Sequence, residues 1–229
     1  MNKYELHAHT SNCDIVAKLS GADLVRLYHD KGYSGIVITD HYFAEFFDWF
    51  GDEVSVTSDH KDIIDRYLKG YNSAKEEAEK LGFTVLCGAE VRFDNIKNDY
   101  LVYGLEPEDL YNLPLLNRLK GVKELLEVLP DYAVVVQAHP FRNNMVVKNP
   151  KSLFGIEVYN GGTESFRNEM ARIYAEHYGK VMTSGSDIHI IDALAKGGIA
   201  TERKITCSRD LVDVLRSGEY SLIADGEIK

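Results

Sequence analysis

Apolar segments of two kinds alternate along the chain and predict an ordered series of strands and helices. Strands are predicted where β-branched and aromatic residues form short runs, at 4–9, 35–41, 84–91, 100–105, 133–140, 155–160 and 180–189. Helices are predicted where apolar residues recur at helical spacing, at 22–32, 59–82, 121–130, 165–179 and 208–218. Ser20 and Ser208 are expected N-caps, and Gly70 is an expected weak point within the longest helix.

This alternation predicts an α/β protein with a largely parallel sheet. The number of predicted strands suits either a distorted barrel or an open doubly wound sheet. No Gly/Ser/Pro-rich linker, internal repeat or low-complexity tract interrupts the pattern, so we expect residues 1–229 to form a single domain. Segments 42–56 and 141–153 are predicted loops. The first, rich in aromatic and acidic residues, is interpreted either as a wall of the substrate site or as an apolar cluster under a loop.

Composition and charge narrow the range of partners. The formal net charge of −10 argues against general binding to nucleic acid or to anionic membranes, although a local basic pocket is compatible with it.

Three scattered cysteines without a C-x-x-C pair are typical of reduced thiols, and no apolar run approaches the ~20 residues of a membrane span. The first residues lack the apolar stretch of a secretory leader. We therefore expect a cytoplasmic protein.

Histidines and acids gather at the C-terminal ends of the predicted strands. They are His7, His9, Asp40, His41, Glu90, His139, Asp187 and His189. Residues two apart on a strand share a face, so the pairs His7/His9 and Asp187/His189 each point one way. In a parallel barrel these strand ends meet at one site. Imidazoles and carboxylates are ligands for Zn²⁺, Mn²⁺ and iron, and cations would relieve the repulsion between the carboxylates, so the pattern predicts a metal cluster.

Taken singly, each of these residues has an ordinary structural interpretation. A histidine at a strand end is commonly hydrogen-bonded within the fold. Asp40 could cap the following segment, and Glu90 could pair with Arg92. The prediction of a metal site depends on the combination of residues, and on the expectation that the fold brings them together.

The same residues form a recognisable series. "HAHT" with Asp14, "ITDH", "GAEV", "AHP" and "SGSDIH" occur in this order between residue 4 and about residue 201. The series resembles the PHP (polymerase and histidinol phosphatase) domain family. The resemblance implies an α/β fold of the distorted (β/α)7, TIM-like barrel type, with up to three metal ions at the C-terminal ends of the strands.

The resemblance also implies a set of metal ligands: His7, His9, Glu90 and Asp187 for one ion, Glu90 and His139 for a second, and Asp14, His41 and His189 for a third. Many relatives supply a further histidine to the second ion, on the strand after the glutamate. This chain has "NDYLVYG" there, and Asp99 is the nearest substitute. We expect two or three divalent ions, Zn, Mn or Fe, with the occupancy of the second site left open.

The activity that the resemblance implies is hydrolysis of a small phosphorylated substrate, histidinol-phosphate-like or nucleotide-like, through a metal-bridging hydroxide. The candidate catalytic residues are Asp40, His41, Glu90 and His189, with Asp40 or an unligated histidine assisting the leaving group. The candidate substrate-binding residues are Arg142, Arg92, Arg203 and Asn160, although each arginine is equally compatible with an ordinary surface position.

Other functions stay open at this level. Glu157 and Asn160 in "IEVYN" could line the pocket, or Glu157 could form a hydrogen bond inside the barrel. A nucleic-acid exonuclease is disfavoured by the charge. A C–N hydrolase and a non-catalytic, metal-stabilised interaction domain are the remaining alternatives. The sequence makes no prediction of oligomeric state.

Overall fold

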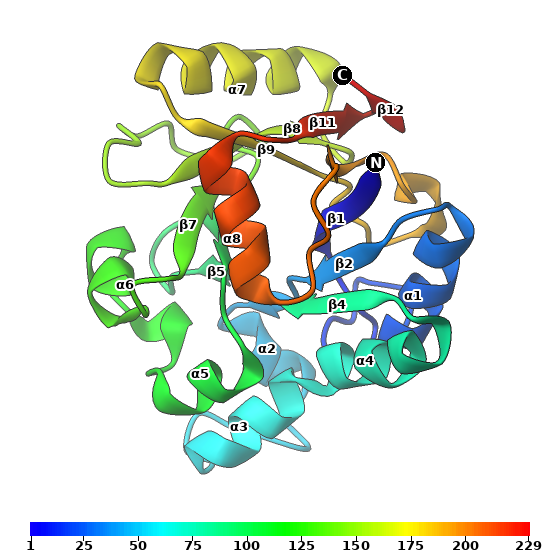
Figure 1. The fold of residues 1–229 in the computed structure, drawn as a ribbon. Coiled ribbons are helices and arrows are strands. Elements are labelled where there is room, and N and C mark those ends of the chain that lie inside the picture. The colour runs from blue at the N-terminus through cyan, green and yellow to red at the C-terminus, as the bar shows by residue number, and fades with distance from the viewer.

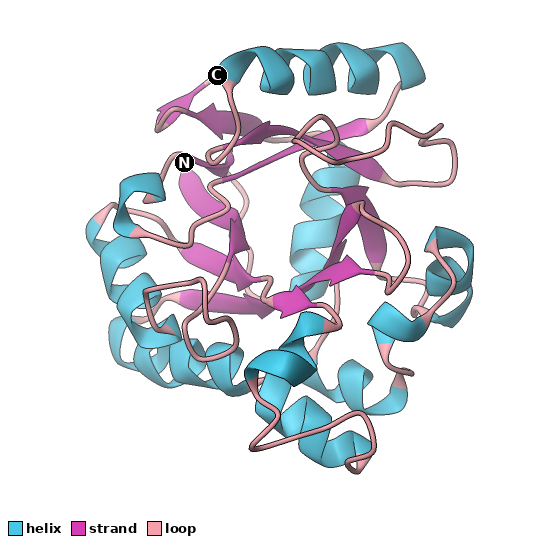
Figure 2. Ribbon diagram, turned by 180° about the vertical axis from the view of Figure 1, so that it is seen from behind, coloured by secondary structure: helices cyan, strands magenta, loops and turns pink.

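The strands of the protein form a ring with helices on its outside (Figures 1 and 2). The computed structural model describes all 229 residues. One six-stranded sheet has the order β12 (Glu227–Ile228), β11 (Ser221–Ala224), β10 (Gly197–Thr201), β1 (Asn2–Ala8), β2 (Gly35–Ile38), β4 (Thr84–Cys87). The other has the order β3 (His41–Tyr42), β5 (Ala89–Arg92), β6 (Asp99–Tyr103), β7 (Val134–Gln137), β8 (Gly155–Asn160), β9 (Val181–Gly185).

The two sheets meet on both sides of the ring. On one side the chain passes from β4 through Gly88 directly into β5. On the other, Ala8 at the end of β1 forms a parallel bridge to Ile188 beyond β9, and the His9 amide donates to the Ile188 carbonyl at 3.2 Å. Strand β6 is antiparallel to both β5 and β7, and β10, β11 and β12 form an antiparallel extension beside β1, whereas the other neighbouring strands are parallel. The predicted α/β class and distorted TIM-like barrel architecture are confirmed, with β6 and β10–β12 as the departures from a fully parallel arrangement.

The helices surround the ring, and one of them covers one of its two ends (Figure 1). They are α1 (Gly21–Asp30), α2 (Glu45–Trp49), α3 (His60–Tyr67), α4 (Lys69–Leu81), α5 (Pro107–Asn112), α6 (Val122–Val128), α7 (Ser165–Tyr178) and α8 (Ser208–Ser217). Helix α8 crosses the end of the ring that faces the viewer in Figure 1. Its apolar face, including Leu211 and Leu215, packs in one buried cluster with Leu6 and Tyr103 from the strands.

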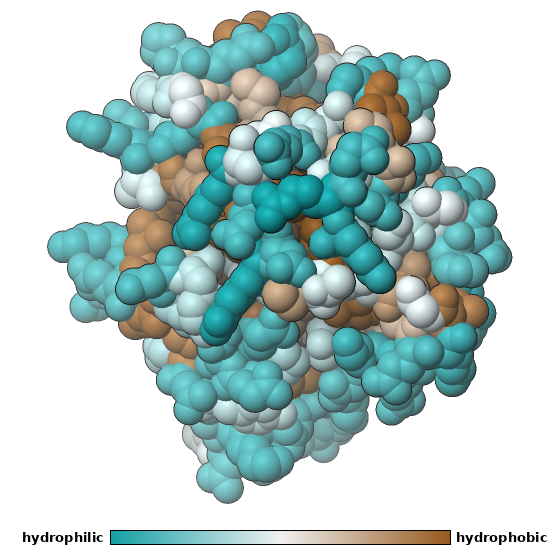
Figure 3. All heavy atoms as spheres, in the orientation of Figure 1, coloured by the Kyte–Doolittle hydropathy of each residue, from teal (hydrophilic) through white to brown (hydrophobic).

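The end closed by α8 is the N-terminal end of β1 and carries mostly hydrophilic side chains on its outer surface (Figure 3). The opposite end, seen in Figure 2, is where β1, β2, β7 and β9 finish and where loops connect them to the helices. None of the helices combines the length and the apolar character that crossing a bilayer requires.

Several local predictions need correction. The helix predicted over 59–82 is two helices, because the chain breaks at Leu68 between α3 and α4. The predicted loop 42–56 contains the short helix α2. Ser20 does cap α1 in a capping box with Asp23, but Ser208 is the first residue of α8, whose N-cap is Cys207. Strands β10, β11 and β12 were not predicted, because the first is glycine-rich and the last has only two residues.

Gly70 permits the close approach of α4 to the end of β1. A Cβ atom there would lie 2.1 Å from Thr10 Oγ1 and 2.2 Å from Asp40 Oδ2, which is closer than side chains can pack. The requirement for glycine at this position therefore comes from packing, although the residue weakens the helix locally.

Replacing Gly70 with alanine tests this packing. Helix propensity alone predicts that Gly70→Ala stabilises the protein by up to about 1 kcal/mol. The overlap with Thr10 and Asp40 predicts the opposite sign, a loss of about 1–3 kcal/mol. Urea unfolding would measure the difference. Gly51→Ala on an exposed turn is the control and should change stability less, because its added Cβ would meet only the Phe47 carbonyl, at 3.1 Å. A stabilised Gly70→Ala variant would contradict this packing.

Candidate metal centre

Nine buried or nearly buried side chains converge at the open end of the ring. His7 and His9 come from the end of β1, and a register irregularity between Glu5 and Ala8 marks this part of the strand. The two rings lie 5.0 Å apart, and both residues are fully buried. The other seven come from the loop after β1, from β3, β5 and β6, and from the segments that directly follow β7 and β9. The fold thus brings together every residue that the sequence indicated as a metal ligand.

Their ligand atoms form four overlapping groups, in each of which all atoms lie within 4.8 Å of one another. The groups are His9/Asp14/His41/His189, His7/His139/Asp187, His7/His9/Glu90 and Glu90/Asp99/His139. Glu90 lies at the centre, because one oxygen is 3.0 Å from His41 Nε2 and the other is 2.9 Å from His139 Nε2. A carboxylate shared in this way can bridge neighbouring ions.

Two of the candidate ligands have an unusual backbone conformation. His139 has φ = 26° and Asp187 has φ = 50°, which non-glycine residues adopt only at a cost of about 1–3 kcal/mol each. Strain at two residues of one cluster indicates that the surrounding structure holds these side chains in position. Such strain is typical of functional sites.

Several buried polar atoms of the cluster have no well-aligned hydrogen bond within the protein. They are His7 Nε2, both ring nitrogens of His9, Asp14 Oδ2 and Asp187 Oδ1. Asp14 Oδ2 lies 2.6 Å from His41 Nδ1, and Asp187 Oδ1 lies 3.2 Å from His9 Nε2, as ion pairs. Leaving a buried polar atom without a partner costs about 1–3 kcal/mol. Nitrogen and oxygen atoms that face a common centre at these spacings fit a divalent transition-metal ion, which would satisfy several of them at once.

Electrostatics link the histidines to the acids. Burial lowers the pKa of His41, but the Asp14 and Glu90 carboxylates outweigh burial and raise that pKa to about 10. Burial raises the pKa of Glu90, yet His7 and His139 outweigh this and hold it well below the usual range. Without a metal ion, protonated imidazoles therefore provide the positive charge that the carboxylates require.

Hydrogen bonds from a second layer of residues orient the ligands. Glu157 accepts from His7 Nδ1 at 2.8 Å, from the His139 backbone amide at 2.9 Å and from Asn160 Nδ2 at 2.9 Å. The first of these directs His7 Nε2 towards the cluster, as carboxylate partners of ligating histidines do. The sequence left the role of Glu157 open, and the structure shows the hydrogen-bonded alternative.

Asn160 is a positioning residue in this structure, which corrects the prediction that it binds substrate. It is fully buried, and its amide nitrogen donates to Glu157 and, at 3.1 Å, to Asp187 Oδ2. Its side-chain oxygen accepts from Gly162 and Thr163. No hydrogen-bonding capacity is left for a ligand.

Asp40 belongs to none of the four ligand groups. Its two oxygens accept from the Thr10 backbone amide at 2.6 Å and from the Thr10 hydroxyl at 2.8 Å. Burial raises the pKa of Asp40 to about 7, against the effect of the Thr10 hydrogen bonds. Asp40 thus holds the loop that follows His9, and its catalytic role stays a prediction.

Glu5 is a functional candidate that sequence analysis missed. It is fully buried and accepts from the backbone amides of His7 and Ser186 at 2.9 and 2.8 Å, and from the Tyr28 hydroxyl. It therefore ties the strand carrying His7 to the residue before Asp187. The available signal was an acid on an apolar strand, two residues before His7 and so on the same face.

The three remaining predicted residues, all arginines, have three different placements. Arg92 forms a two-point ion pair with Asp99, at 2.7 and 2.8 Å, and does not pair with Glu90. Arg142 donates to Asp187 Oδ2 at 2.8 Å and is one-third exposed. Arg203 lies at the N-terminal end of β1, where Asn2 pairs with Thr201, and the structure does not bring it to the cluster. Its predicted substrate role is thereby corrected.

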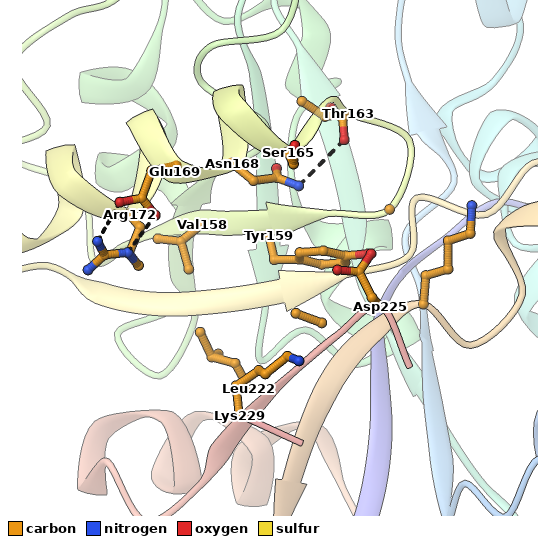
Figure 4. Close-up of a pocket in the computed structure, with 13 residues that line it drawn as sticks. Val158, Tyr159, Thr163, Ser165, Asn168, Glu169, Arg172, Leu222, Asp225 and Lys229 are labelled. Carbon is orange, nitrogen blue, oxygen red and sulfur yellow. Dashed lines mark hydrogen bonds and ion pairs between the residues drawn. The ribbon is translucent and has the colours of Figure 1, made fainter. Parts of the chain in front are cut away.

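A cavity of about 680 Å³ lies beside the Asp99–Asp187 side of the cluster. Its lining includes Arg92, Arg142, Lys97, Asn143, Asp94 and Glu45. Cationic and amide groups suit an anionic ligand there. A second cavity, of about 470 Å³, lies between β8, α7 and the C-terminal strands, around Tyr159, Asp225 and Lys229 (Figure 4). None of the nine candidate ligands lines either cavity, but Arg92 and Arg142 in the first cavity contact the candidate ligands Asp99 and Asp187.

The raised pKa of His41 predicts that metal binding releases protons. At pH 7 this side chain is protonated in the metal-free protein, since its pKa is about 10, and an imidazole must be neutral to bind a metal. Titration calorimetry with Mn²⁺ in two non-coordinating buffers of different ionisation enthalpy should show release of at least about one proton, and affinity that falls as the pH is lowered. A heat independent of the buffer would contradict this.

Two protein-family models match the chain, and together they cover most of its length. The family model described as the PHP domain matches residues 5–192, and the model described as PHP-associated matches residues 166–220. No curated protein sequence matches the chain significantly.

Solved structures with similar folds include a two-domain protein from Bacteroides vulgatus that contains a predicted PHP-like metal-dependent phosphoesterase. It has a TM-score of 0.69 and 17% identity, and the match covers 99% of this chain and 66% of that one. A candidate metal-dependent phosphoesterase from Bifidobacterium adolescentis has a TM-score of 0.54 and 16% identity, with 93% and 95% covered. An amidohydrolase from Chromobacterium violaceum, with bound sulfate and no metal, has a TM-score of 0.56 and 14% identity, with 97% and 98% covered.

At these identities the solved structures bear on the fold alone, and they agree with the barrel architecture. The family match covers most of the chain and includes each of the nine candidate ligands, from His7 to His189. The chain therefore belongs to the PHP domain family.

Proposed function

We propose that the protein is a metal-dependent phosphoesterase that hydrolyses a small phosphorylated molecule. The observation that carries the proposal is the pairing of Arg142 with Asp187, at the edge of an otherwise buried group of metal-ligating residues. A guanidinium group placed there can bind phosphate oxygens next to the ions. Two or three divalent ions, Zn, Mn or Fe, are expected in the cluster.

Bound divalent ions would supply an activated water and a clamp for the oxygens of the phosphoryl group. The residues that would hold the ions are those of the four ligand groups described above. Glu90 belongs to two of these groups. Asp99 is the least available ligand, because Arg92 already binds both of its oxygens. We therefore expect the ion near Asp99 to be the most weakly held.

Two side chains of the protein would act on the substrate directly, one by binding the phosphate and the other by donating a proton. Arg142 uses one guanidinium nitrogen for Asp187, and its remaining N–H groups are free to bind a phosphate oxygen. His189 has the most exposed side chain of the nine candidate ligands, at 23%. When it does not bind an ion, it is the group best placed to donate a proton to the leaving oxygen.

The alternatives are less well supported by the site. A cavity of about 680 Å³ suits a small molecule better than a nucleic-acid strand, and the net charge of −10 gives no basic track. Compared with a C–N hydrolase acting on a neutral substrate, a phosphoesterase accounts better for the two arginines in this cavity, because guanidinium groups bind anions. A non-catalytic domain would not need so complete a set of ligands, at least two of them in strained conformations.

Loss of one shared ligand tests the metal assignment. His9 belongs to two groups of ligand atoms, so His9→Ala should remove most of the bound metal and reduce phosphate release at least about 100-fold. The fold should persist, as circular dichroism would show. His29→Ala, a histidine exposed on α1, is the matched control and should keep both metal and activity. Full metal content and activity in His9→Ala would overturn the assignment.

Substitution of Arg142 separates substrate binding from chemistry. A charge-assisted hydrogen bond contributes about 1.5–3 kcal/mol, so Arg142→Ala should raise KM for a phosphate ester by roughly 10- to 100-fold, with a smaller change in kcat. Arg142→Lys should recover only part of this loss, because lysine lacks the two-point geometry. Steady-state kinetics with a chromogenic aryl phosphate would provide the measurement. An unchanged KM in Arg142→Ala would remove this residue from the substrate site.

A further inference from the structure

The metal centre opens to solvent on the side of His41 and His189. Their side chains are 9% and 23% exposed, whereas the side chains of the other candidate ligands are at most 3% exposed. The His189 ring stacks on His9 with centroids 4.2 Å apart and lies 5.3 Å from the His41 ring. A substrate reaching the ions from this side must pass the residues around these two histidines.

Those residues are apolar and exposed. Ile15 and Val16 directly follow the candidate ligand Asp14, and Ile190 and Ile191 directly follow His189. Each of the four is between 47% and 52% exposed. None of them belongs to a buried apolar cluster or packs against one. The packing of the core therefore does not explain why these four large aliphatic side chains are exposed beside a polar site.

Hydrogen bonds hold these two segments next to each other and to the cluster. The Lys18 amide donates to the His189 carbonyl at 2.8 Å, and the Val16 amide donates to Asp14 Oδ1 at 2.8 Å. On the same side, the Trp49 ring lies 6.1 Å from the His41 ring. We call Ile15, Val16, Trp49, Ile190 and Ile191 the apolar rim.

The apolar rim contrasts with the other side of the centre. There the cavity is lined by Arg92, Lys97 and Arg142, and Arg142 contacts Asp187. A phosphoryl group among the ions would thus have Arg92, Lys97 and Arg142 on one side and the apolar rim on the other. The Lys18 ammonium, which donates to the Ile15 carbonyl at 3.1 Å, is a cationic group next to the rim.

We propose that the apolar rim binds the alcohol portion of the substrate, and that this portion is an apolar or aromatic group. The proposal rests on the proposed function, since the phosphoryl group is what places the alcohol at the rim. In the reaction the phosphorus–oxygen bond to the alcohol breaks and a bond from phosphorus to the water oxygen forms. One proton of the water passes to the alcohol oxygen, so the products are the free alcohol and inorganic phosphate.

Phosphonates test the rim without turnover, because their carbon–phosphorus bond resists hydrolysis. We would measure the Kd of n-hexylphosphonate and of methylphosphonate for the Mn²⁺-loaded protein by titration calorimetry. Each fully buried methylene corresponds to a factor of about four in affinity. Partial burial of the five added methylenes should make n-hexylphosphonate bind at least about tenfold more tightly.

Variants assign this preference to the rim. Ile191→Ser and Val16→Ser should each weaken n-hexylphosphonate binding by about three- to tenfold and leave methylphosphonate unchanged. Ile173→Ser is the matched control, because Ile173 is 53% exposed on α7 and is not part of the rim. It should change neither Kd.

The outcomes separate the two proposals. Equal Kd values for the two phosphonates, or an equal loss in Ile173→Ser, would overturn the role of the rim and leave the phosphoesterase proposal standing. Failure of both phosphonates to bind, together with no release of phosphate from any ester, would overturn the proposed function and the role of the rim with it.

Discussion

The structure depends on keeping several acids and several imidazoles buried at one end of a barrel. Asp14, Glu90, Asp99 and Asp187 would repel one another strongly in a medium of low polarity if no positive charge lay between them. Protonated histidines balance part of this charge, as the raised pKa of His41 indicates. They leave other buried atoms, such as His7 Nε2 and Asp187 Oδ1, within ion-pair distance of each other but without a hydrogen bond. Divalent ions would balance the charge and satisfy these atoms together.

A second set of acids, none of them in a ligand group, holds the ligands in place. Glu5 connects the backbone of β1 to the residue before Asp187, Glu157 directs His7 and holds the His139 backbone, and Asp40 fixes Thr10 beside α4. Each binds backbone amides from a distant part of the chain. The cost of burying these carboxylates is thus offset by hydrogen bonds that join separate strand ends, which gives the site its rigidity.

Much of this site could be predicted from the sequence, because the spacing of His7 and His9, and of Asp187 and His189, follows the alternation of a strand. The hydrogen-bond partners of individual side chains could not be predicted from the sequence. Asp40 and Asn160 are polar residues near the ligands, and only the structure shows that their atoms are used by Thr10, Glu157 and Asp187. Arg203 was proposed from its residue type alone. Its position depends on β10, an antiparallel strand too rich in glycine to be recognised.

The most direct test of the central claim is a count of metal ions. Elemental analysis of the protein, purified without chelators and again after reconstitution with Mn²⁺, Zn²⁺ or Fe²⁺, should find two or three ions per chain. That result would show that the buried acids and imidazoles form a multinuclear centre. Less than one ion per chain under every condition would contradict the account, because the buried charges would then be balanced by protons alone.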